Sequence, residues 1–245
     1  METSRFYIAH LFQIKPFGVL LVDKSLGFII DALPLLLAGA LVTLRLTAAA
    51  TFFGSILGIA LGIARLSKVK VIRLLSRIYV DFFRGTPLLV QLLIIYFGIP
   101  PLLQSFGINF GLDRGVAAIL GLSLNAAAYL AEIVRAGIQS IETGQKEAAE
   151  SLGLGSGETM RYVVFPQAIR RMIPPLGNEF IILLKDTSLV AFIGYQELLK
   201  QGQLIVAKNF RAFEIYITVA VIYLLLTILA SQVFSWLERR MNPTT

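Results

Sequence analysis

The stretch PLLLAGALVTLRLTAAATFFGSILGIALGIA, residues 34–64, is predominantly apolar over more than the length of one membrane crossing. A helix that spans the hydrocarbon core of a bilayer needs ~20 mostly apolar residues. Further regions of this kind lie within residues 78–106, where Pro100 and Pro101 interrupt the run, and within 115–136, 172–198 and 212–236. We therefore expect an all-α integral membrane protein with five transmembrane helices.

The composition supports this fold class. The 245 residues are 56% hydrophobic and 15% charged, and the mean hydropathy is +0.77. Soluble domains are typically ~45–50% apolar even when glycine is counted. The sequence contains no cysteine, which excludes disulfides and thiolate metal sites. Its one histidine, His10, lies in the N-terminal tail, so we assign no metal site.

The distribution of basic residues predicts the orientation. The segment between the first two spans carries many positive charges against Asp81 alone, and the third loop and the C-terminus are also basic. Cytoplasmic loops are enriched in lysine and arginine, so the N-terminus should lie outside and the C-terminus inside. The loop before the fifth span agrees less well with this orientation, because it would lie outside and yet is basic. The residues concerned are Arg65, Lys68, Lys70, Arg73, Arg77 and Arg84, then Lys146, Arg161, Arg170 and Arg171, then Arg239 and Arg240, with Lys200, Lys208 and Arg211 in the discordant loop.

This distribution also bears on partners and domains. A net charge of +7 in a soluble protein would suggest nucleic acid, but here the charge is spread over membrane flanks, so no nucleic acid is expected. Residues 1–32 are interpreted as an N-terminal interfacial or periplasmic segment, because charges interrupt their apolar patches. Residues 33–238 form the transmembrane domain, and 239–245 a cytoplasmic tail.

Small residues form a stripe along the first span. Gly54, Gly58 and Gly62 are spaced by four, and Thr43, Thr47, Thr51 and Ser55 follow a similar course. Small residues four apart lie on one helix face and let another helix approach closely. The stripe therefore predicts helix packing in preference to a pore lining.

Charged and polar side chains occur inside the predicted spans. Lys185 and Asp186 interrupt the apolar run FIILLKDTSLVAFIG, residues 180–194, near the middle of the fourth span. Each charge costs roughly 2.5–3.5 kcal/mol at a helix centre, so such residues usually face a bundle interior or a water-filled cavity. The third span carries Asn125, Tyr129 and Glu132 on one helix face, and Gln91 adds an amide from the second span.

These residues are candidates for a substrate path. A free amino acid needs acceptors for its ammonium group and donors for its carboxylate. Asp186 or Glu132 could accept the ammonium, Lys185 could face the carboxylate, and the hydroxyls of Thr187 and Ser188 could serve either group. The alternative is a structural or gating role, as a buried ion pair or a clamp at a subunit interface.

The third loop is too polar to span a membrane and too patterned to be a linker. It reads IQSIETGQKEAAESLGLGSGETMRYVVFPQAIRRMIPP, residues 138–175. The segment around Glu147 favours a helix, and Gly153 follows where a helix would end in a left-handed residue. Ser156 should cap a second helix, with Glu158 at its N-terminus. The pattern predicts a helix–turn–helix elbow on the cytoplasmic face, within residues 138–171.

The elbow sequence resembles the EAA signature of ABC importer permeases. The matching residues are Glu147-Ala148-Ala149, then Gly153 after three residues, then Val163-x-Phe165-Pro166 after nine more. Three further stretches are similar to the polar-amino-acid branch of that family, and the resemblance covers about residues 39–237. These stretches are Arg84-Gly85-Thr86-Pro87-Leu88-Leu89-Val90-Gln91, Ala131-Glu132-Ile133-Val134-Arg135-Ala136-Gly137-Ile138 and Lys185-Asp186-Thr187-Ser188-Leu189.

The resemblance implies a set of partners. A second permease, identical or related, should pair with this chain, two ATP-binding subunits should dock beneath it, and an extracytoplasmic binding protein should deliver the amino acid. Glu147, Ala148, Ala149 and Gly153 would form the contact with the ATPase. ATP and Mg would be bound by that partner, since this sequence has no GxxxxGK[ST] loop and is not expected to be an enzyme.

The predicted function is therefore the membrane subunit of an ATP-driven amino acid importer in the bacterial cytoplasmic membrane. A secondary transporter or channel that works without an ATPase is the alternative, and a structural membrane assembly subunit is a third possibility. The sequence does not distinguish one amino acid from another, nor a homodimer from a heterodimer.

Overall fold

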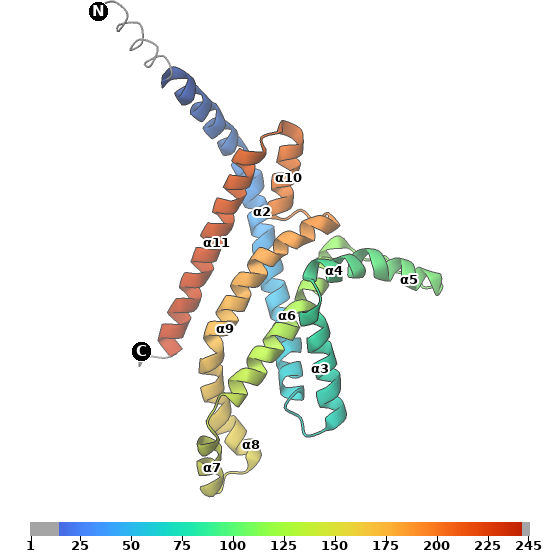
Figure 1. The fold of residues 1–245 in the computed structure, drawn as a ribbon, viewed down its shortest axis with the longest axis vertical. Helices are drawn as coiled ribbons and strands as arrows, with labels where there is room; N and C mark the ends of the chain where they lie inside the picture. The colour runs from blue at the N-terminus through green and yellow to red at the C-terminus, as the bar shows by residue number, and fades with distance from the viewer. Residues whose placement is uncertain (1–14, 242–245) are drawn as a thin grey trace, which may run out of the picture.

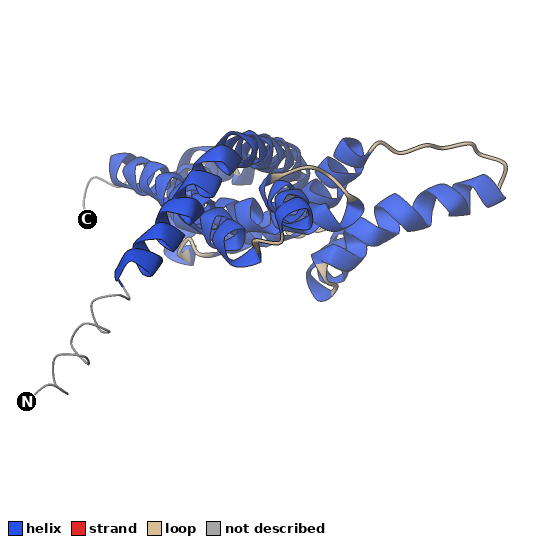
Figure 2. Ribbon diagram, turned by 90° about the horizontal axis from the view of Figure 1, so that it is seen from above, coloured by secondary structure: helices blue, strands red, loops and turns tan. Residues whose placement is uncertain are grey.

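The chain folds into long helices joined by short loops. The computed structural model describes residues 15–241, and within them the regular structure is helical, without strands (Figures 1 and 2). The longest helices are α2 (Lys15–Ala64), α6 (Arg114–Gln139), α9 (Phe165–Asp186) and α11 (Ala212–Met241). The shorter ones are α3 (Lys70–Gly85), α4 (Leu88–Leu93), α5 (Ile99–Ser105), α7 (Thr143–Ser151), α8 (Ser156–Glu158) and α10 (Leu198–Asn209).

Four helical segments are long and apolar enough to cross a membrane, among the described residues. They are Leu26–Ala64, Leu88–Ser105, Arg114–Gln139 and Ala212–Met241. These segments contain or overlap the predicted first, second, third and fifth spans, and they show a multi-pass membrane protein of helical class. Residues 15–32, expected to form a separate segment, begin α2 and continue into the first span. Residues 1–14 of that segment lie outside the described residues, and its position at the interface stays a prediction.

The predicted fourth span, residues 172–198, changes its helical form partway along and turns before its end. Helix α9 ends at Asp186, and residues Thr187–Ile193 form a tighter 3-10 helix that stops at Gly194, whose φ is +80°. A glycine takes this left-handed conformation without strain, so the chain turns there before α10. Lys185 therefore lies in the last turn of α9, where a positive charge is favoured by the helix dipole.

The predicted second span is also interrupted. Helix α3 ends at Gly85, Thr86 and Pro87 are extended, and α4 begins at Leu88. Proline disfavours helical geometry at the preceding residue, which explains the break. A π-helical turn at Ile94–Gly98 then leads into α5, and this arm projects to one side of the bundle (Figures 1 and 2).

Helices α2 and α6 form the centre of the bundle, and the glycine stripe lies between them. An added Cβ at Gly54, Gly58 or Gly62 would come within 3.0, 2.7 and 2.7 Å of the Cβ atoms of Ala126, Leu130 and Val134. The two distances of 2.7 Å are shorter than real Cβ contacts and the one of 3.0 Å is unusually tight, so glycine is what permits this approach. The predicted packing role is confirmed for the three glycines of the stripe.

Two further apolar clusters complete the fold. One joins α2 to α10 and α11 through Leu36, Leu198 and Ile215, which are fully buried. The other joins the end of α6 to the elbow and α9, and includes Val134, Ile138, Ile141, Val164, Ala168 and Met172. The outer faces of α2 and α11 stay apolar and exposed, as expected for surfaces against lipid or another subunit.

Candidate functional site

The KDTSL segment forms the junction between α9 and its 3-10 extension. The hydroxyl of Thr187 is fully buried and donates to the carbonyl of Leu184 at 2.7 Å, so it closes the helix end. Lys185 is exposed and Asp186 is partly buried, and neither forms a hydrogen bond or ion pair within the described residues. The two charges are thus available to a ligand or to another subunit.

Gln91 and Asn125 are brought together, as expected for residues of one site, but their amide groups are already engaged. The Gln91 Nε2 donates to the carbonyls of Phe83 and Thr86 at 2.9 and 3.0 Å, and the Asn125 Nδ2 donates to Gln91 Oε1 at 3.0 Å and to Phe83 at 3.2 Å. The carbonyls at the end of a helix lack intrahelical partners. The two amides donate hydrogen bonds to these carbonyls at the break before Pro87, which accounts for the burial of Gln91 and Asn125. Their place in a substrate path stays a prediction.

Glu132 lies among three arginines from three helices. Its carboxylate is 2.6 Å from the Arg65 Nη1 at the end of α2, 3.1 Å from the Arg135 Nε, and 4.0 Å from the Arg84 Nη1 at the end of α3. The Arg84 guanidinium also lies over the ring of Tyr129, 5.3 Å from its centroid. A carboxylate held by so many guanidinium groups is a poor acceptor for a substrate ammonium, so the geometry favours the structural role considered for Glu132.

Replacing Glu132 with glutamine should therefore destabilise the bundle. The change leaves three converging positive charges without their anion, and we expect a loss of about 1–2 kcal/mol in the free energy of unfolding, since the carboxylate is still 24% exposed. Denaturation in detergent followed by circular dichroism measures it. Asp81→Asn is the matched control, because its pair with Arg77 is an exposed contact along α3 and should contribute almost nothing. Equal stability of the two variants would contradict the interpretation.

A small cavity lies inside the bundle, next to a carboxylate that was not singled out as a site residue. It has a volume of about 180 Å³ and is lined by Glu179 together with side chains of α2, α6, α9 and α11. Within the described residues Glu179 forms no hydrogen bond or ion pair, and the buried Thr51 hydroxyl has no partner. The lining comprises Thr51, Ser55, Ala126, Leu130, Leu176, Glu179, Phe180, Leu183 and Phe234.

The spacing of Glu179 contains a signal that could have identified it. Glu179 precedes Asp186 by seven residues, so both carboxylates lie on roughly the same face of α9, two turns apart. Unpaired polar atoms beside a cavity are uncommon in proteins, because buried polar groups normally find partners. The arrangement can accept a small cation or an ammonium group. Neither here nor at any other place in residues 15–241 do three His, Cys, Asp or Glu side chains gather to hold a metal ion.

Another carboxylate, that of Glu197, has a structural role. Glu197 is fully buried, accepts from the backbone N–H groups of Leu199 and Lys200 at 2.9 and 2.7 Å, and so caps α10. The Tyr223 hydroxyl donates to it at 2.7 Å and the Thr43 hydroxyl at 3.4 Å. Glu197 thus joins α2, α10 and α11, and its carboxylate oxygens have their hydrogen-bond donors within the chain.

The elbow has the predicted form, with one correction. Gly153 follows α7 with a φ of +90°, as expected, and Glu147 and Ala148 are exposed on α7 while Ala149 is buried. The predicted cap at Ser156 is wrong. Gly155 precedes the second helix, and its backbone N–H donates to the Glu158 carboxylate at 2.9 Å. Gly155 therefore occupies the N-cap position and Ser156 is the first residue of the helix, while Glu158 supplies the half of a capping box that needs no side chain at the N-cap.

The elbow is firmly attached to the bundle. Val164 and Ala168 are buried against Val134 and Ile138 of α6, and the Arg171 guanidinium donates to the carbonyl of Ser140. A displacement of α7 would therefore be transmitted to α6 and α9. Figure 1 shows α7 and α8 at one end of the molecule, below the ends of both helices.

Comparison with known proteins gives a consistent result. Residues 54–243 match the family described as "Binding-protein-dependent transport system inner membrane component". The chain is 43% identical over 211 residues to the glutamine transport system permease protein GlnP of Escherichia coli, covering 86% of this chain and 94% of that protein. It is 37% identical over 219 residues to the L-cystine transport system permease protein TcyL of Bacillus subtilis, covering 89% and 92%.

Solved structures agree with these matches. A chain from an amino acid ABC transporter crystallised with histidines superposes with a TM-score of 0.80 at 42% identity, covering 86% of this chain and 96% of that one. A chain of the MetNI methionine ABC transporter in an inward-facing conformation gives 0.68 at 26%, covering 85% and 97%. The resemblance inferred from the EAA signature is confirmed. The chain belongs to the family of inner membrane components of binding-protein-dependent transport systems.

Proposed function

We propose that this chain is the membrane-spanning subunit of an ATP-driven importer of polar amino acids in the bacterial cytoplasmic membrane. The observation that carries the proposal is the family match over residues 54–243, which includes the whole elbow. Relatives named as glutamine, cystine and arginine permease proteins support the substrate class. The five-span topology with the N-terminus outside belongs to the same proposal, as does the pairing with a second permease.

The proposed recognition of the amino acid centres on α9. Glu179 and Asp186 are carboxylates that form no hydrogen bond or ion pair among the described residues, and the cavity beside Glu179 is also lined by Thr51, whose hydroxyl has no hydrogen-bond partner. In this scheme one of the two carboxylates accepts the substrate ammonium, and Lys185 attracts the substrate carboxylate. Both charges of a zwitterion would then be matched along one helix. Thr187 is less suited to the task than predicted, because its hydroxyl is already bonded to Leu184.

The proposed coupling runs through the elbow. Glu147, Ala148 and Gly153 are exposed at the end of the molecule, where an ATP-binding subunit could dock, and two copies of it would serve two permeases. ATP and Mg would be held by those subunits. An extracytoplasmic binding protein would deliver the amino acid at the opposite end, near α10.

The test is ATP-driven uptake in proteoliposomes that contain the complete complex and its binding protein, against a panel of amino acids. At least one of the variants Glu179→Gln and Asp186→Asn should lower uptake at low substrate about 10-fold or more, since hydrogen bonds to charged groups contribute about 1.5–3 kcal/mol. Glu214→Gln, in the first turn of α11, is the control and should transport normally. Unchanged uptake in both α9 variants would refute the recognition scheme, and uptake without any ATPase would favour a secondary transporter.

A further inference from the structure

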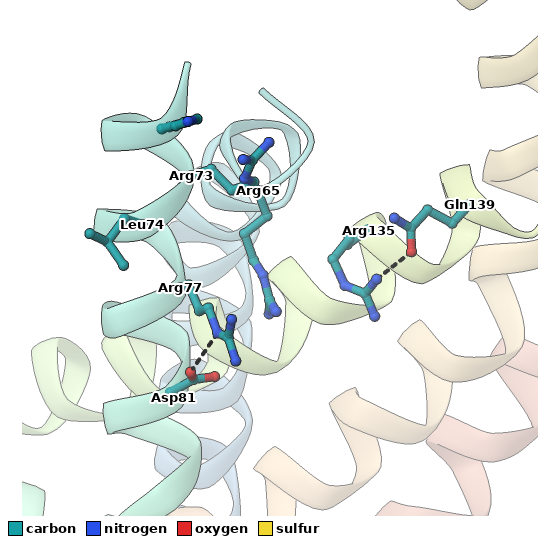
Figure 3. A pocket seen from close by; sticks show the side chains of 8 residues that line it. Arg65, Arg73, Leu74, Arg77, Asp81, Arg135 and Gln139 are labelled. Atoms are coloured by element: carbon teal, nitrogen blue, oxygen red, sulfur yellow. Dashed lines mark hydrogen bonds and ion pairs between the residues drawn. The ribbon is translucent and has the colours of Figure 1, made fainter. Parts of the chain in front are cut away.

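A basic pocket lies between the ends of α2 and α6 and the first half of α3. Its volume is about 530 Å³, and five of its lining side chains are cationic. Figure 3 shows Arg65 reaching into the space between α3 and α6, with Arg73 and Arg77 on one side and Arg135 on the other. The lining residues are Arg65, Lys70, Arg73, Leu74, Arg77, Asp81, Arg135 and Gln139.

The acidic groups nearby do not balance this charge. Asp81 lies 3.3 Å from Arg77, and Glu132, which does not line the pocket, binds both Arg65 and Arg135. Two anions against five cations leave an excess of three positive charges. Lys70 has no ion-pair partner among the described residues, and Arg73 donates only to the backbone carbonyl of Ser67. The pocket is therefore complementary to an anion.

The position of the pocket narrows the class of anion. The membrane-crossing segments Leu26–Ala64 and Arg114–Gln139 both end here, so the cations lie at the depth of lipid headgroups. Helix α3 alternates these cations with apolar side chains, and Val71, Leu75 and Ile78 are 64%, 62% and 56% exposed. A ligand that contacts both the cations and the apolar side chains of α3 needs a negative headgroup and an acyl chain.

We propose that this pocket binds an anionic phospholipid of the cytoplasmic leaflet, with its phosphate between α3 and α6 and its acyl chains along the apolar face of α3. The assignment to that leaflet rests on the orientation given under the proposed function. Basic pockets between transmembrane helices on the cytoplasmic side are suited to anionic headgroups, and each lysine or arginine near such a surface strengthens binding about fivefold. Bound lipid would also hold the end of α3 against α6.

Native mass spectrometry of the detergent-purified complex tests the proposal. The purified complex is titrated in three separate experiments: with phosphatidylglycerol, with phosphatidylcholine of the same acyl chains, and with phosphatidylglycerol in the presence of glycerol 3-phosphate. We expect preferential binding of phosphatidylglycerol, and binding roughly 30-fold weaker in the Arg73→Gln/Arg77→Gln variant. The matched control is Arg239→Gln/Arg240→Gln, which removes two exposed arginines from the end of α11 and should bind as the parent does.

Three results would overturn the proposal: equal binding of both lipids, unchanged binding by the α3 variant, or displacement of the lipid by equimolar glycerol 3-phosphate, which would mark a site for a soluble phosphate. Lys70→Gln, a single exposed change, repeats the measurement with little risk to folding and should weaken binding about fivefold. Lipid binding is measured without transport. Its outcome therefore does not depend on whether the α9 variants lose uptake, and the two proposals can fail separately.

Discussion

Replacing Gly58 with leucine should destroy the central helix pair. An added Cβ at this position would lie 2.7 Å from the Leu130 Cβ and 3.0 Å from the Ala127 carbonyl oxygen, so α2 and α6 would have to separate. Overpacking typically costs 1–3 kcal/mol, and here a whole isobutyl group meets rigid backbone, so we expect a loss of about 3 kcal/mol. Size-exclusion chromatography and thermal unfolding in detergent measure the effect.

The control lies in the same helix. Gly27 is exposed in α2 and an added Cβ there meets nothing within 4 Å, so Gly27→Leu should leave the unfolding midpoint unchanged or raise it slightly through helix propensity. If both variants were equally stable, the close approach of α2 and α6 would not be needed for folding. If both were equally unstable, the loss would come from added apolar surface and not from the helix contact.

Replacing Gly153 with valine should uncouple transport while leaving the bundle folded. Gly153 adopts a φ of +90°, and an added Cβ meets no other atom, so the cost is one of backbone strain alone. A β-branched residue is strongly disfavoured at positive φ, so the turn between α7 and α8 must change shape. Because this turn shapes the proposed contact with the ATPase, we expect ATP-driven uptake to fall at least ~10-fold. Uptake and co-purification of the ATPase are both measured.

Gly144→Val separates strain from bulk. Gly144 is exposed in the first turn of α7, its φ is negative, and an added Cβ there also meets nothing within 4 Å. The same side chain is thus placed in the same elbow without strain, and coupling should persist. Normal uptake by Gly153→Val, with the ATPase retained, would show that the turn does not carry the proposed coupling.

The elbow and the glycine stripe illustrate what the sequence alone could predict. Both depend on spacing within one helix or across one turn, and such local geometry is nearly independent of the rest of the fold. The same holds for Gly153, whose conformation follows from its place after α7. The break at Pro87 could have been read from the same local rules, but the apolar run on either side hid it.

The candidate site was harder to predict, because its meaning depends on partners distant in sequence. For Glu132 the sequence left open both a substrate contact and a structural ion pair, and the structure favours the ion pair because Arg65 and Arg84 approach it from other parts of the chain. Gln91 and Asn125 hold each other and the end of α3. Glu179 carried no distinguishing local signal beyond its spacing from Asp186. Its importance comes from the cavity beside it, which α2, α6, α9 and α11 enclose together.

The sequence by itself determined the helical membrane class, the elbow and the family resemblance, because hydropathy and short-range spacing are encoded locally. Only the tertiary structure decided which polar side chains are already satisfied and which are free. That distinction depends on atoms brought together from separate helices. Glu132 and Glu179 are the same residue type in the sequence, but three arginines surround the first and the second lines a cavity.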